Sequence, residues 1–158
     1  MLKEYLDENC ILLNPEIDDK FELLKNMANL LLREGYVTED FEQKVIEREK
    51  VFPTGLPMEK VGFAIPHADA KYVRKSGLCI TILDKPIKFF RMDDNNVEID
   101  IDFVIMIAMK NPDEQLKTLQ SLIDSFNNIE GWLELKRASK AQEAVERLRK
   151  LFQSFSPN

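Results

Sequence analysis

The sequence predicts an α/β fold, with a single mixed β-sheet flanked by helices on both faces. Apolar residues recur at helical spacing in some segments and alternate as in a strand in others, and the two kinds of segment alternate along the chain. Residues 103–109 are continuously apolar, which is typical of a strand covered on both faces. With 158 residues, 44% of them apolar, the chain can form one domain, 1–158, around a sizeable core.

The first third of the chain predicts a short strand followed by two helices. Residues 10–13 are apolar and stop at an Asn-Pro pair, as a strand does before a turn. Residues 18–33 carry apolar side chains at three- and four-residue spacing, with acidic residues at the start. Thr38 is a candidate N-cap for a second helix that runs to about Lys50. The prolines and glycine of residues 53–57 then predict a loop.

The middle of the chain predicts three strands. Residues 61–65 and 77–83 are short apolar runs of the length and composition of strands. Residues 97–109 begin with alternating apolar and acidic side chains and end in the continuous apolar run. We expect this last strand to be half exposed at its start and buried on both faces at its end.

Three helices are predicted beyond residue 110. The first opens at Asn111, an N-cap residue followed by a proline and two acidic residues. A short helix surrounds Trp132, and the last helix begins after Ser139, which forms a capping box with Gln142. The helix after Asn111 carries one apolar face, made of Leu116, Leu119, Leu122, Ile123 and Phe126.

Composition argues against two classes of function. The net charge is -6, and no basic patch suggests a nucleic-acid partner. No stretch approaches the ~18 apolar residues of a membrane span, and the first residues lack the apolar core of a signal peptide, so we expect a cytoplasmic protein. Cys10 and Cys79 lie in apolar surroundings, which favours reduced core thiols over a disulfide.

His67 is the only histidine of the chain, and it directly follows the predicted strand 61–65. Pro66 restricts the backbone at the entry to its loop, and catalytic side chains commonly lie on loops that rigid strands position. The imidazole has an ordinary pKa of ~6.5, so it is mostly neutral at cytosolic pH and can act as a nucleophile or a base. The alternative is a histidine with a structural role only.

Metal binding and hydrolysis are other common uses of a histidine. A metal site is disfavoured because one histidine and two dispersed cysteines offer no chelating pair. No Gly-x-Ser-x-Gly turn supports a hydrolytic triad. We therefore predict no metal and no cofactor.

Two further segments offer groups that bind phosphate. Arg48 lies in the charged run 47–50, and its guanidinium is a planar clamp for phosphate oxygens. Thr54, in the loop that follows, offers a hydroxyl. The helix start from Asn111 to Gln115 presents free N–H groups to an anion. The structural alternatives are a solvated helix end and an ordinary helix cap.

Two motifs lie close together between Arg48 and His67. Arg48 begins the run Arg-Glu-Lys-x-x-Pro-Thr-Gly, and His67 ends the run Gly-Phe-Ala-Ile-Pro-His. Together they resemble the fructose/mannitol class of enzyme IIA of the bacterial sugar phosphotransferase system, over nearly the whole chain from about Cys10. The residues that follow His67 and the run Asn-Pro-Asp-Glu-Gln from Asn111 look most like the galactitol-specific branch.

The resemblance implies a phosphoryl relay on the phosphotransferase/anion-transport-type IIA fold. In such proteins the histidine at the position of His67 accepts a phosphoryl group from the phosphocarrier protein HPr and passes it to a cysteine of enzyme IIB. The membrane permease, enzyme IIC, takes part indirectly. Arg48 would stabilise the phosphoryl oxygens, with a hydrogen bond from Thr54. Neither Cys10 nor Cys79 has the setting of a IIB cysteine, so we expect IIB on a separate chain.

Gln115 marks a departure from mannitol-type relatives, which carry a second histidine near the start of the late helix. An amide donates a hydrogen bond but does not change charge at neutral pH, so a two-histidine mechanism is excluded. Three functions remain open. They are uptake of a hexitol, galactitol above all, a nitrogen-type regulatory module whose phosphorylation state controls a protein partner, and a plain interaction domain.

Overall fold

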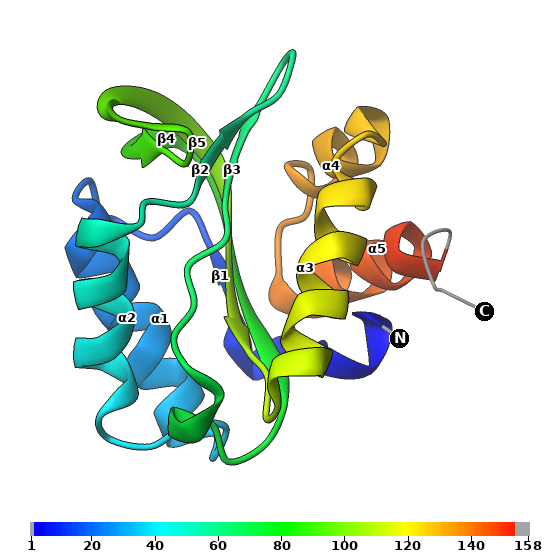
Figure 1. The fold of residues 1–158 in the computed structure, drawn as a ribbon. Coiled ribbons are helices and arrows are strands. Elements are labelled where there is room, and N and C mark those ends of the chain that lie inside the picture. Colours follow the sequence, from blue (N-terminus) through cyan, green and yellow to red (C-terminus); the bar gives the residue numbers. More distant parts are fainter. Residues whose placement is uncertain (1, 154–158) are drawn as a thin grey trace.

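The computed structural model describes residues 2–153 and confirms the α/β architecture. One mixed sheet lies between two layers of helices, with α1 and α2 on one face and α3, α4 and α5 on the other (Figure 1). Within the described residues, none of the helices combines the length and apolar character needed to cross a bilayer. The strands are β1 (Ile11–Leu13), β2 (Gly55–Pro57), β3 (Gly62–Ala64), β4 (Gly77–Arg91) and β5 (Asp94–Ala108), and the helices are α1 (Lys20–Arg33), α2 (Phe41–Val51), α3 (Pro112–Ser125), α4 (Ile129–Leu135) and α5 (Ala141–Gln153).

A long antiparallel hairpin of β4 and β5 forms the centre of the sheet, and β4 continues well past the predicted end at residue 83. β1 pairs in parallel with β4, and β3 pairs in parallel with β5, where Phe63 lies opposite Phe103. β2 joins β3 to the far end of β4, where Gly55 lies opposite Arg91. The pairing places the end of β3, and the loop that follows it, beside the buried half of β5.

The buried half of β5 accounts for the continuous apolar run in the sequence. Every side chain from Phe103 to Ala108 is fully buried, whereas residues 94–98 are exposed. Successive side chains of a strand point to opposite faces, so the run supplies both cores. Phe103, Ile105 and Ile107 face the α3 side, and Val104, Met106 and Ala108 face the α1 side.

Aromatic rings fix β3 against the helices of the α3 side. The rings of Phe63 and Phe126 are stacked with 3.8 Å between centroids, and Trp132 meets Phe63 edge-on at 5.0 Å. The Trp132 Nε1–H donates a hydrogen bond of 3.0 Å to the Ser125 carbonyl, so its polar atom is satisfied. The strand that leads to His67 is therefore anchored on this face.

The second helix and the following loop differ from their predictions. The helix begins at Phe41 with Asp40 at the N-cap position, and the Thr38 hydroxyl is buried with no hydrogen-bond partner in the part of the chain described. The Thr38 carbonyl accepts a bond from the Phe41 N–H, so the residues before the helix form a turn. The predicted loop 53–57 contains β2, three residues that pair with β3, the next strand along the chain, and with the far end of β4.

Only part of the apolar face predicted for helix α3 is turned to the core. Leu122 and Phe126 are buried as expected and Leu119 packs against the core, but Leu116 and Ile123 are 58% and 42% exposed. Thr118 lies inward instead, where its hydroxyl donates to the sulfur of Met109 at 3.3 Å. A threonine is tolerated in this core because its polar atom finds an acceptor there.

The two predicted caps of the late helices have different outcomes. The Asn111 side chain accepts a hydrogen bond of 2.8 Å from the Glu114 N–H, as an N-cap does. The Ser139 hydroxyl lies 3.5 Å from the Glu143 carboxylate, in place of the capping box predicted with Gln142. Helix α5 correspondingly begins two residues after Ser139.

Replacing Asn111 with alanine should lower the free energy of unfolding by about 1 kcal/mol, because the Glu114 N–H loses its acceptor. Urea unfolding followed by circular dichroism measures the change. Asn111→Asp keeps an acceptor at the same position and should stay close to the wild type. An equal loss in both variants would contradict the cap as the cause.

Candidate active site

His67 lies in the loop that leaves β3, as the sequence predicts. The loop backbone runs beside β5: the Pro66 carbonyl accepts a hydrogen bond of 2.9 Å from the Ile107 N–H, and His67 forms an isolated parallel bridge with Ile107. The side chain is 9% exposed. The imidazole is thus held against a buried strand of the sheet.

The imidazole has a defined tautomer. Its Nδ1 lies 2.8 Å from the carbonyl oxygen of Ile65. Because a carbonyl oxygen only accepts, Nδ1 carries the proton, and in the neutral ring Nε2 carries the lone pair. Nε2 is therefore the nitrogen that can attack an electrophile.

The surroundings keep this ring neutral. Burial lowers the pKa of His67 from its ordinary value of 6.5, and the positive charge of Arg48 lowers it further, against the raising effects of the bond to Ile65 and of Asp69. At neutral pH the ring is therefore unprotonated on Nε2. This is the state that a nucleophile requires.

Arg48 lines a cavity of about 320 Å³ whose wall includes Ala68 and Asp69, the two residues after His67. The guanidinium carbon lies 5.4 Å from the centroid of the Phe52 ring. Within residues 2–153 no carboxylate forms an ion pair with Arg48, so its N–H groups are available to an anion. The structure thus brings Arg48 to the His67 loop, as the motif implies.

Thr54 is buried and does not line this cavity. Its hydroxyl donates to Oε1 of Glu49 at 2.9 Å and accepts from the Ile65 N–H at 3.1 Å. Its own N–H donates to Oε2 of Glu49 at 2.8 Å. Because the hydroxyl is already bonded in both directions, it joins α2 to the loop that follows β3, and the structure does not support the predicted role as a phosphate ligand.

Glu49 is the residue of this site that the sequence analysis misses. It is 4% exposed, and burial raises its pKa to about 7, although hydrogen bonds and neighbouring cations act in the opposite direction. In the sequence it belongs to a charged run that suggests a solvated helix end. The available signal is its spacing, because Phe41, Val45 and Glu49 share one buried face of α2.

Gln115 lies in the first turn of α3, and within residues 2–153 no hydrogen bond joins it to His67. Its Oε1 is buried without a hydrogen-bond partner among the same residues. The nearby helix start is occupied by its own side chains, since Asn111 caps the Glu114 N–H and the Glu114 carboxylate accepts from the Lys110 N–H at 3.2 Å. An acidic side chain therefore stands where the sequence predicts an anion site.

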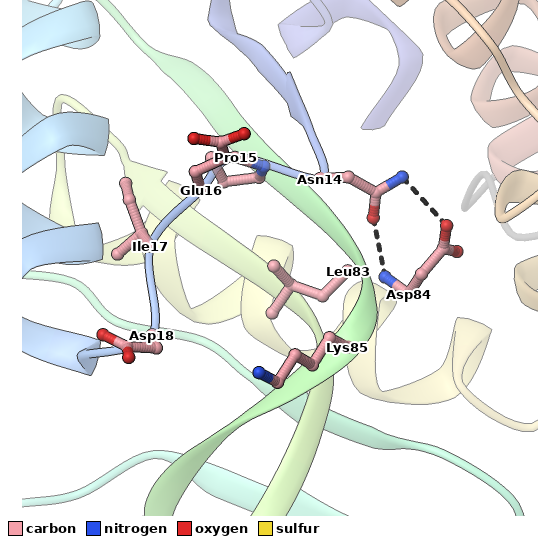
Figure 2. A pocket seen from close by; sticks show the side chains of 8 residues that line it. All are labelled: Asn14, Pro15, Glu16, Ile17, Asp18, Leu83, Asp84 and Lys85. Carbon is pink, nitrogen blue, oxygen red and sulfur yellow. Dashed lines mark hydrogen bonds between the residues drawn. The ribbon is translucent and has the colours of Figure 1, made fainter.

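A larger cavity, of about 470 Å³, lies between the turn after β1 and the middle of β4 (Figure 2). Figure 2 shows Asn14 joined to Asp84 by two hydrogen bonds, of 3.1 and 2.7 Å. Glu16, Asp18 and Asp84 outnumber Lys85 in its lining. An acidic lining repels a phosphoryl group, so this cavity is not a site for phosphate chemistry.

Comparison with known families adds to this geometry. The model of the family described as "Phosphoenolpyruvate-dependent sugar phosphotransferase system, EIIA 2" matches residues 4–151. The chain belongs to this family. Members of the EIIA family are phosphotransferases that work through a phosphohistidine intermediate, and this chain shares that activity.

Relatives of this EIIA chain include components for two hexitols. The galactitol-specific EIIA component of Escherichia coli (strain K12) is 34% identical over 104 residues, which cover 66% of this chain and 69% of the relative. The mannitol-specific phosphotransferase enzyme IIA component of Halalkalibacterium halodurans is 31% identical over 148 residues, which cover 92% and 94%.

Solved structures of the same fold include a nitrogen regulatory protein and a mannitol enzyme IIA in complex with enzyme IIB. Nitrogen regulatory protein IIA-Ntr of Neisseria meningitidis superposes with a TM-score of 0.75 at 26% identity, over 92% of this EIIA chain and 97% of that one. The complex of mannitol enzyme IIA with phosphorylated enzyme IIB, from Escherichia coli, gives 0.75 at 24% identity, over 92% and 97%. The second match establishes a shared fold.

Proposed function

We propose that this chain is a phosphoryl carrier in which Nε2 of His67 accepts a phosphoryl group from phospho-HPr and passes it to a cysteine of a separate enzyme IIB. One observation carries the proposal: the only histidine of the chain has Nδ1 bonded to the Ile65 carbonyl and, among residues 2–153, no hydrogen bond on Nε2, and the two residues after it line a cavity together with Arg48. A IIA–IIB complex of the same fold supports the choice of acceptor. Cys10 and Cys79 are free and buried, which suits a relay in the reducing cytoplasm.

The transfer requires no proton movement on His67. The Nε2 lone pair attacks phosphorus, and the bond from phosphorus to the donor breaks with its electron pair left on the donor. Nδ1 keeps its proton, and the Ile65 carbonyl stabilises the positive charge that the ring gains. The Arg48 guanidinium binds the phosphoryl oxygens of the loose transition state. In the second step a IIB thiolate attacks phosphorus, and the electron pair of the broken N–P bond returns to Nε2.

We propose a hexitol as the transported sugar, with galactitol as the first choice and mannitol as the alternative. The galactitol-specific relative has the higher identity of the two, whereas the mannitol-specific relative matches over more of the chain. Phosphoryl transfer from the labelled chain to IIB of each system separates them. We expect faster transfer to the galactitol IIB.

A regulatory role is the second candidate, because IIA-Ntr shares the fold at 26% identity. In that role the phosphorylation state of His67 would control binding to a protein partner, and no sugar would be phosphorylated. Normal phosphoryl uptake combined with no transfer to either IIB would favour this function.

The site assignment is tested by incubating the chain with enzyme I, HPr and labelled phosphoenolpyruvate. We expect one phosphoryl group per chain, labile to acid and stable to alkali, and dependent on HPr. In ¹⁵N-histidine-labelled protein, NMR should place phosphorus on Nε2, because Nδ1 is engaged with the Ile65 carbonyl. Phosphorus on Nδ1, or no label while a known IIA is labelled in parallel, would overturn the proposal.

A further inference from the structure

We propose that Glu49 is a positioning residue for phosphoryl transfer: its ionised carboxylate holds the His67 loop through Thr54 and Ile65, and transfer slows when that carboxylate is protonated. The inference rests on the proposed role of His67 as the phosphoryl acceptor. Glu49 does not touch the reacting nitrogen. It acts through three hydrogen bonds in series.

These hydrogen bonds all run in one direction. The His67 Nδ1–H donates to the Ile65 carbonyl at 2.8 Å, the Ile65 N–H donates to the Thr54 hydroxyl at 3.1 Å, and that hydroxyl donates to Oε1 of Glu49 at 2.9 Å. The Thr54 N–H occupies the other carboxylate oxygen at 2.8 Å. An ionised carboxylate accepts both bonds from Thr54, whereas a protonated one must turn an oxygen into a donor.

Protonation of Glu49 therefore weakens the hydrogen bonds between Thr54 and Glu49, at the end of this series. The Thr54 hydroxyl already accepts the Ile65 N–H, so its proton needs an acceptor, and Glu49 supplies it. Thr54 and Glu49 are 3% and 4% exposed, so water does not readily replace a lost acceptor. Arg48 is adjacent to Glu49 on α2, so a shift of this end of the helix would also move the guanidinium. Displacements of about 1 Å at such a site are enough to slow a reaction strongly.

The surroundings of Glu49 give its carboxyl group a pKa close to neutral pH. Burial raises the pKa of Glu49 to about 7, against the lowering effects of the Thr54 hydrogen bonds and of two cations, Lys20 at the start of α1 and Arg48 on α2. Burial lowers the pKa of His67 from 6.5. As the pH falls, the carboxylate takes up its proton before the imidazole does. Protonation of Glu49 is therefore expected to cause the fall of the transfer rate toward acidic pH.

The first measurement uses the wild-type chain. The rate of phosphoryl uptake from phospho-HPr is followed from about pH 5.5 to 8.5, together with the ¹⁵N signals of the single imidazole. We expect the rate to fall about threefold between about pH 8 and 6.5, as the ionised fraction of the carboxylate falls and the protonated form keeps about a tenth of the rate. The ¹⁵N signals should show that the imidazole titrates at lower pH. They should also show a small second inflection near the pH at which the transfer rate is half its maximum, because Glu49 titrates there. A rate midpoint that coincides with the imidazole titration would overturn the inference.

Glu49→Gln should lower the rate at about pH 8 roughly tenfold, because the loop loses an acceptor. It should also move the rate midpoint down to that of the imidazole and remove the second inflection. The matched control is Glu42→Gln, which removes the same charge from the first turn of α2, away from the site, and should keep the wild-type profile. An unchanged midpoint in Glu49→Gln overturns the inference.

Thr54 variants test the hydrogen bonds between His67 and Glu49 without altering a charge. They also test the inference if Glu49→Gln does not fold. Thr54→Val removes the hydroxyl and should shift the midpoint as Glu49→Gln does, whereas Thr54→Ser restores the hydroxyl and should restore the midpoint. Equal midpoints in both variants would contradict the inference. If the wild type takes up no label, the proposed function fails and the role of Glu49 in phosphoryl transfer fails with it. If label is taken up but the imidazole signals lack the second inflection, the proposed function stands and the role of Glu49 is refuted.

Discussion

A chain with alanine in place of His67 should take up no phosphoryl group from phospho-HPr. The chain has one histidine, so no second imidazole can replace it. Gln115, whose Oε1 is buried at the start of α3, carries an amide and no nucleophilic nitrogen. With labelled phosphoenolpyruvate, enzyme I and HPr, we expect uptake to fall at least ~10³-fold, as when the nucleophile of an enzyme is removed.

The fold should survive the loss of this side chain. Among residues 2–153 the imidazole makes one hydrogen bond, to the Ile65 carbonyl, and it lies in a loop at the end of β3. Circular dichroism and urea unfolding of His67→Ala are therefore expected to match the wild type closely. Acid-labile, alkali-stable label on a folded His67→Ala chain would show that another residue accepts the phosphoryl group.

The elements with strong periodicity are predictable from the sequence, and β2 is not. The spacing predicts a helix over 18–33, and α1 occupies Lys20–Arg33. β2 has three residues in a segment rich in proline, and its pairing partners come from β3 and β4. Gly55 shows the reason: a Cβ there would lie 2.5 Å from the Phe90 carbonyl oxygen. That requirement exists only after the distant strand β4 has been placed beside β2.

Local motifs identify part of the site, and long-range burial determines the rest. His67 stands out because it is the only histidine and follows a predicted strand, and Arg48 belongs to a recognisable run. Glu49 lies in the same run, but its role depends on contacts with Thr54 and Ile65 that the sequence does not display. A glutamate between an arginine and a lysine is usually solvated. Only its position on the buried face of α2 distinguishes it.

Replacing Arg48 with alanine should slow phosphoryl uptake roughly 100-fold, because the phosphoryl oxygens lose a cation with several aligned N–H donors. The side chain lines the cavity next to the His67 loop and is exposed in the free chain, so the docked donor protein is expected to shield it from water. Stopped-flow or quenched-flow transfer from phospho-HPr measures the rate. Lys50→Ala, which removes a charge from the same helix outside this cavity, is the matched control and should transfer at the wild-type rate.

Arg48→Lys separates charge from geometry. A lysine keeps the charge but loses the planar fork, so we expect a rate between those of the wild type and Arg48→Ala. The imidazole provides an independent readout, because the charge of Arg48 lowers the pKa of His67. Arg48→Ala should therefore raise the pKa of the imidazole, and Arg48→Lys should raise it less. If Arg48→Ala shifts the imidazole titration but leaves the transfer rate unchanged, the guanidinium acts on the ring from a distance and does not bind the phosphoryl group.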